Sequence, residues 1–193
     1  MSMGKIIKNT AILLAITLVA AIALAFVNNI TAGPIAEAQQ KAKEDAYRAV
    51  LSEADAFAEI DGAAKVIEDL NAAQTNKAKP FVVEVLQGTK AGEKVGYAVT
   101  VSAKGYGGQV KLALGLDATA KVVGYAVLDC SGETAGFGAR AKDADVAEKF
   151  VGITSGEDVV DAISGATHTT EALMADAQIA IDLVKQLEGG NQE

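Results

Sequence analysis

The N-terminal part of the chain contains an uninterrupted apolar run. AILLAITLVAAIALAFV, from Ala11 to Val27, holds 17 residues without a charge. As a helix it would be roughly 26 Å long, which is near the lower limit for crossing a bilayer. The alternative is a cleaved signal peptide, because Ala23-Leu24-Ala25 has the form of a cleavage site. The length of the run favours a retained anchor, since the apolar part of a signal peptide is usually shorter.

Positive charge on one side of this run predicts its orientation. Lys5 and Lys8 precede it, and positively charged flanks stay in the cytoplasm. We therefore expect a cytoplasmic tail over 1–9, a single transmembrane helix over 10–28, and everything beyond it outside the cell membrane.

A helical period of four follows the apolar run. Thr31 is suited to capping a helix and Pro34 to its first turn. We expect a connecting helix within residues 29–55, with an otherwise polar surface. We interpret it as a solvated spacer, with packing against a partner as the alternative. Its thin apolar stripe consists of Ala38, Ala42, Ala46 and Val50.

The pattern then changes to a period of two. Apolar residues alternate with others over 95–101, 109–116 and 122–129, and a short apolar run covers 81–86. Alternation is typical of strands with one buried face. The connections are too short for crossover helices, so an antiparallel meander is expected.

Two helical stretches follow the predicted strands, at Ala144–Phe150 and Thr169–Leu187. Strands that precede helices indicate an α+β domain, which we place at residues 56–193. The predicted fold class is therefore α+β, with one N-terminal transmembrane helix followed by a domain whose antiparallel sheet is flanked by helices.

Composition and charge exclude several classes of site. Cys130 is the only cysteine and His168 the only histidine, so neither an intramolecular disulfide nor a cysteine or histidine metal cluster is possible. The formal net charge is −8, and the chain beyond the apolar run carries 15 basic and 25 acidic groups. This balance argues against binding to nucleic acid, which needs basic surfaces.

Two glycine-rich segments are candidates for ligand contact. KGYGGQ, between two strands, permits close approach of a ligand, although a glycine-rich hairpin is equally expected there. In CSGETAGFGARA, Gly136, Gly138 and Ala141 match the dinucleotide pattern G-x-G-x-x-A. The neighbouring strands are expected to be antiparallel, which argues against that interpretation.

The third candidate is DAISGATHTTEA, which opens the last predicted helix. It can be an ordinary helix cap. It can also supply Thr167 or Ser164 as a nucleophile with His168 as the base, but the nucleophile elbow G-x-S-x-G is absent. A phosphate site fits better physically, because a helix N-terminus presents free N–H groups and the positive end of the helix dipole.

These segments together resemble a known family. Residues 161–167, DAISGAT, match the D-x-x-[ST]-G-A-T motif of proteins that carry flavin mononucleotide (FMN) on a threonine. GYGG and GETAGFG are similar to segments of the same FMN-binding domain, with Ala135 where the family usually has proline. In length and order the chain resembles the G subunits of Rnf complexes, which couple electron flow between ferredoxin and NAD to ion movement. The longer C subunits of the sodium-translocating NADH–quinone oxidoreductase are the second choice.

The resemblance implies a cofactor, a site and partners. FMN would be joined by a phosphoester bond to Thr167, by a separate magnesium-dependent flavin transferase that uses FAD as donor. The chain would be an electron-carrying subunit of a translocating oxidoreductase, without substrate turnover of its own, held among other membrane subunits. Two other hypotheses remain open: an assembly subunit without a cofactor, and a secreted hydrolase. The expected FMN-binding residues are Thr167, Ser164, Gly165, Ala166, His168, Thr169, Glu133, Thr134, Gly136 and Tyr106.

Overall fold

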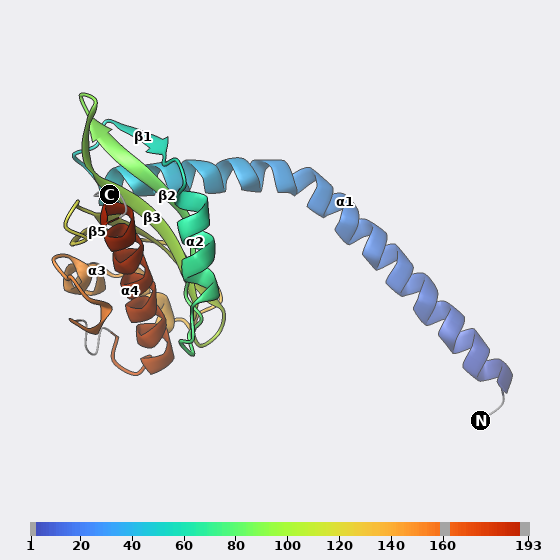
Figure 1. The fold of residues 1–193 in the computed structure, drawn as a ribbon. Coiled ribbons are helices and arrows are strands. Elements are labelled where there is room, and N and C mark those ends of the chain that lie inside the picture. The colour runs from blue at the N-terminus through green and yellow to red at the C-terminus, as the bar shows by residue number, and fades with distance from the viewer. Residues whose placement is uncertain (1–2, 159–162, 190–193) are drawn as a thin grey trace. The chain divides into compact units, whose positions relative to one another are not determined.

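The computed structural model describes residues 3–158 and 163–189. The chain forms two compact units, residues 1–42 and 43–193. The first unit is helical, and the second contains a sheet with helices on its two faces (Figure 1).

Helix α1 (Met3–Val50) contains the apolar run and continues well beyond it. Within the described residues it is the one helix that is long and apolar enough to cross a membrane. No new helix starts at Thr31, whose hydroxyl donates to the carbonyl of Val27 at 3.0 Å. Pro34 lies inside α1, where it removes one backbone N–H donor. The many alanines around it favour a helix strongly enough to offset that local loss.

The second unit contains a five-stranded sheet with neighbours in chain order, which confirms the predicted meander. Every pair of adjacent strands is antiparallel. The strands are β1 (Ala56–Glu59), β2 (Phe81–Lys90), β3 (Glu93–Lys104), β4 (Gln109–Leu116) and β5 (Val122–Asp129).

Two short elements of this unit were not predicted. Strand β1 is only four residues long and mostly exposed, so it carries no alternation to detect. Helix α2 (Ala63–Ala72) buries only Ala63 and Leu70. Its N-cap is Gly62, which has a positive φ of 79° and makes no side-chain cap. Without a cap residue or a wide apolar stripe, α2 lacks the usual sequence signals of a helix.

One face of the sheet forms the main core with helix α4 (Thr167–Gly189). Val99 and Val101 of β3 face Leu114 and Leu112 of β4 in the strand register and have no exposed surface. Leu173 of α4 packs into the same cluster. Helices are thus present at both predicted positions, α3 (Ala144–Phe150) and α4, the latter starting two residues earlier than expected.

The other face of the sheet is covered by the C-terminal end of α1. Tyr47 and Val50 are buried there against Ala98 of β3 and Ala113 of β4. The sequence suggested a solvated spacer, but these residues belong to the same compact unit as the sheet.

A polar cluster holds the same end of α1 on the sheet. The Tyr47 hydroxyl donates to Glu84 of β2 at 2.7 Å and lies 2.6 Å from the hydroxyl of Thr100. Lys43 contacts the same carboxylate at 2.8 Å. Burial disfavours the charge of Glu84, but these two donors outweigh it and lower the pKa of Glu84. A charged, hydrogen-bonded carboxylate therefore joins α1 to β2.

Candidate functional site

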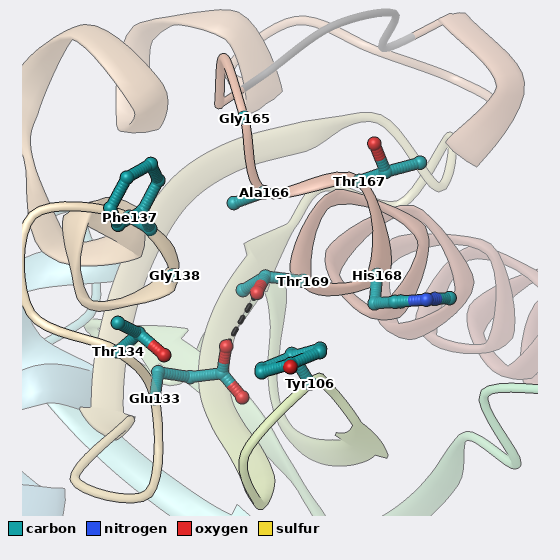
Figure 2. Close-up of a pocket in the computed structure, with 10 residues that line it drawn as sticks. All are labelled: Tyr106, Glu133, Thr134, Phe137, Gly138, Gly165, Ala166, Thr167, His168 and Thr169. Atoms are coloured by element: carbon teal, nitrogen blue, oxygen red, sulfur yellow. Dashed lines mark hydrogen bonds between the residues drawn. The ribbon is translucent and has the colours of Figure 1, made fainter.

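Three segments that are distant in the sequence meet at the N-terminus of α4. They are the turn before α4, the hairpin between β3 and β4, and the loop that follows β5 (Figure 2). Between them lies a pocket of about 460 Å³. Its lining comprises Tyr106, Glu133, Thr134, Phe137, Gly138, Gly165, Ala166, Thr167, His168 and Thr169.

The turn before α4 has a defined geometry. Gly165 has a φ of 76°, and a side chain there would press against the ring of Phe137. The N–H of Ala166 donates to the carbonyl of Ile163 at 3.2 Å, and the N–H of Thr170 donates to the carbonyl of Ala166 at 2.9 Å. Glycine is therefore required for both backbone conformation and space, whereas Ala166 is small because it is buried in the core.

Thr167 is the first residue of α4, and it is exposed at the pocket. The first N–H groups of a helix have no partner within the helix, and the dipole makes this end positive. A phosphate group on the Thr167 hydroxyl would lie next to these donors. The hydroxyls of Thr169 and Thr170 are less accessible than that of Thr167, because both residues are buried.

Glu133 forms the polar floor of the pocket and is only 8% exposed. One carboxylate oxygen accepts a hydrogen bond from the Thr169 hydroxyl at 2.5 Å, and the other accepts one from the N–H of Gly107 at 3.0 Å. The Thr169 hydroxyl points to Glu133 and does not cap the helix (Figure 2). Glu133 thereby ties α4 and the β3–β4 hairpin to its own loop.

Glycines allow this close assembly. A side chain at Gly138 would collide with the Glu133 carboxylate and the Thr169 hydroxyl, and one at Gly107 would collide with the backbone of Gly132. Close contact between the two loops is therefore a sufficient reason for the glycines in these segments.

The only histidine lies at the rim of the pocket. The His168 ring stacks on Tyr106 with a centroid distance of 6.1 Å and an interplanar angle of 16°. Its Nδ1 is 3.3 Å from the carboxylate of Glu171, three residues further along the helix. The contacts of the His168 ring are thus with Tyr106 and Glu171 rather than with a neighbouring hydroxyl.

The structure brings most of the expected residues together. Eight of the ten line the pocket. Ser164 lines a neighbouring cavity that also contacts Thr167, and Gly136, with a φ of 78°, faces open space. Two lining residues, Phe137 and Gly138, were not predicted.

Phe137 and Gly138 lie inside the segment GETAGFG, but no sequence rule shows which side chains of this segment face a pocket. Asp161 and Ala162 of the motif lie outside the described residues.

The pocket offers groups that suit a ligand with an aromatic ring and a phosphate. Its volume lies within the range of roughly 300–1,000 Å³ that is typical of small-molecule sites. Aromatic faces and a few polar groups line it, and a helix N-terminus is available for a phosphate. Among the described residues, no group of three or more His, Cys, Asp or Glu side chains is arranged to hold a metal ion.

Comparison with known proteins agrees with this geometry. Residues 105–182 match the family described as FMN-binding domain, and residues 1–50 match the RnfG N-terminal region. The second match favours the G subunits over the C subunits of the sodium-translocating NADH–quinone oxidoreductase.

Three relatives, all G subunits of translocating oxidoreductase complexes, match along nearly their whole length. The one from the Na⁺-translocating ferredoxin:NAD⁺ oxidoreductase complex of Acetobacterium woodii is 32% identical, with 94% of this chain and 93% of the relative covered. The one from the proton-translocating ferredoxin:NAD⁺ oxidoreductase complex of Clostridium ljungdahlii is 26% identical, with 89% of this chain and 88% of the relative covered. The one from the ion-translocating oxidoreductase complex of Methanosarcina acetivorans is 28% identical, with 96% and 97% covered. The chain therefore belongs to the family of G subunits of Rnf-type ion-translocating oxidoreductase complexes and contains an FMN-binding domain.

Proposed function

We propose that this chain is an electron-transfer subunit of a membrane-bound Rnf-type complex and that it carries FMN covalently on Thr167. The position of Thr167 at the start of α4 and at the edge of the pocket carries this proposal. Its exposed side chain starts α4 at the edge of a pocket lined by aromatic and polar groups. The family membership supports FMN as the cofactor.

Attachment requires one bond to form and one to break. The Thr167 oxygen would bond to the phosphorus of the FMN half of FAD, AMP would leave, and the threonine proton would pass to solvent or to a base. A threonine hydroxyl is a poor nucleophile without activation, so a separate flavin transferase would supply the activation. The exposure of Thr167 allows that enzyme to reach it.

Residues of the chain would then hold the product. The phosphodiester carries one negative charge, which the N-terminus of α4 would favour by roughly 0.3–1 kcal/mol. Glu133 and Thr169 would form the floor beneath the flavin. The bound flavin would supply the redox chemistry, and the protein its position and its surroundings. No independent substrate turnover is expected.

The proposal extends to location and partners. Residues 10–28 would anchor the chain, with the FMN-binding domain outside the membrane and other subunits of the complex beside it. Covalent attachment suits that location, since a lost FMN molecule would not be replaced from the cytoplasmic pool.

Co-expression with a flavin transferase tests the attachment. The wild-type band should fluoresce under ultraviolet light after denaturation in SDS, because only a covalent flavin survives. Thr167→Ala should abolish the signal, and Thr154→Ala, which removes an exposed hydroxyl outside the segment DAISGAT, should keep it. Mass spectrometry of the tryptic peptide 150–185 should show the mass of FMN less one water.

Two outcomes would contradict the proposal. The first is a dark wild-type band although the transferase labels a control protein. The second is a Thr167→Ala band as bright as the wild type.

A further inference from the structure

Two aromatic side chains at the FMN pocket are unusually exposed. Phe137 is 51% exposed and Tyr106 is 72% exposed, and both line the pocket. They come from different loops and lie on either side of the Glu133–Thr169 floor (Figure 2). Aromatic faces bury large apolar areas when a ligand covers them, so exposed faces around one pocket indicate a binding surface.

Phe137 is held in place by its own loop. Its N–H donates to the carbonyl of Thr134 at 3.1 Å, and its carbonyl accepts from the N–H of Arg140 at 3.0 Å. Its ring also limits the space at Gly165 in the turn that presents Thr167. The exposed ring therefore belongs to a fixed wall beside the attachment turn.

Tyr106 is supported on the opposite side. The next residue, Gly107, donates its N–H to Glu133, which fixes the tip of the hairpin. The Tyr106 ring is stacked on His168 of α4, close in sequence to Thr167. Both walls are thus attached to the loop that carries Glu133, and Tyr106 also contacts α4 through His168.

We propose that Phe137 and Tyr106 are positioning residues that hold the flat isoalloxazine ring between them. This inference rests on the proposed function, because the ring is tethered through Thr167. A planar aromatic ligand would cover both exposed side chains and leave the buried Glu133–Thr169 hydrogen bond intact. The two side chains would shield the ring from water, and electron transfer from the Tyr106 phenol to the excited flavin would quench its fluorescence.

The test compares native and denatured fluorescence of the full-length protein in detergent, expressed per attached flavin. In Tyr106→Ala we expect the native signal to rise several-fold, because the quenching phenol is lost, while the signal in SDS per flavin stays at the wild-type value in both Tyr106→Ala and Phe137→Ala. Quenching by iodide should increase in both variants, since the ring becomes accessible to solvent. The matched control is Phe81→Ala, which removes a 39% exposed ring on β2 that does not line the pocket.

Tyr106→Phe separates shielding from quenching. Phenylalanine keeps the aromatic face but is not oxidised by the excited flavin, so protection from iodide should remain while the native fluorescence rises. Wild-type iodide quenching in both alanine variants, or a wild-type fluorescence ratio in Tyr106→Ala, would overturn the inference and leave covalent attachment intact. An unlabelled wild-type chain would overturn both proposals.

Discussion

At the scale of single residues, Asp176 is unusual. It lies in the middle of α4 without solvent exposure, and no hydrogen bond of ordinary geometry reaches its carboxylate oxygens within the described residues. Burial raises the pKa of Asp176 well above its usual value, and the backbone of Ala103 on β3 offsets only part of this effect. Burial therefore favours the protonated, neutral form of this carboxyl in the folded protein.

Asp176→Asn should change how stability depends on pH. The pKa of Asp176 is higher in the folded than in the unfolded chain, so its contribution to stability is complete below the unfolded pKa of about 3.9 and is lost as the pH rises toward the folded pKa. Relative to the variant, the wild type should lose up to about 1.4 kcal/mol per pH unit in that window.

Urea denaturation over a pH series measures this difference in the free energy of unfolding. Asp69→Asn, at an exposed position on α2, is the matched control and should follow the wild type. Parallel profiles for wild type and Asp176→Asn would contradict the assignment of a buried neutral carboxyl.

At the scale of elements, the end of α1 depends on glycines in the sheet. Gly115 of β4 and Gly124 of β5 are neighbours in the strand register. A side chain at either position would collide with the backbone of Val50. The helix end can therefore lie directly on the sheet, where Tyr47 forms its hydrogen bonds. The last turns of α1 are thereby fixed to the FMN-binding domain.

Gly124→Ala should weaken that contact. The added methyl group has no space, and overpacking of this kind typically costs about 1–3 kcal/mol. Thermal unfolding of the full chain in detergent should show a lower melting temperature. Gly33→Ala is the control, because Gly33 lies within α1 with nothing close to it. Equal melting temperatures for Gly124→Ala and the wild type would contradict the contact.

At the scale of the whole molecule, the chain combines an apolar helix with an acidic redox domain. The two lysines before the apolar run favour an N-terminus in the cytoplasm. The proposed electron relay would then act on the outer side of the membrane.

Protease treatment of intact protoplasts tests this orientation. A tag placed after residue 193 should be removed by external protease, whereas a tag before residue 1 should survive; inverted vesicles should give the reverse. A soluble cytoplasmic protein serves as the integrity control. Complete protection of the C-terminal tag in protoplasts would contradict the proposed topology.

Sequence alone determined the features that depend on neighbouring residues. The alternation of Val99 and Val101 predicted a strand, and short connections predicted the meander. The prediction of one exposed face was wrong for β3, whose residues 97–103 are all buried because the end of α1 covers the second face. The apolar run predicted a helix long and apolar enough to cross a membrane, and the segment around Thr167 predicted both a helix start and the family. Each of these signals is contained in a few consecutive residues, because strand and helix periods repeat over short distances.

Only the tertiary structure decided which distant residues meet. It showed that Glu133 accepts the Thr169 hydrogen bond, that Phe137 forms a wall of the pocket, and that the end of α1 lies on glycines of the sheet. The residues that meet in each of these contacts are far apart in the sequence. Their contacts arise when the core excludes water and brings α4 against β3 and the loop after β5, and no local pattern of polar and apolar residues records that outcome.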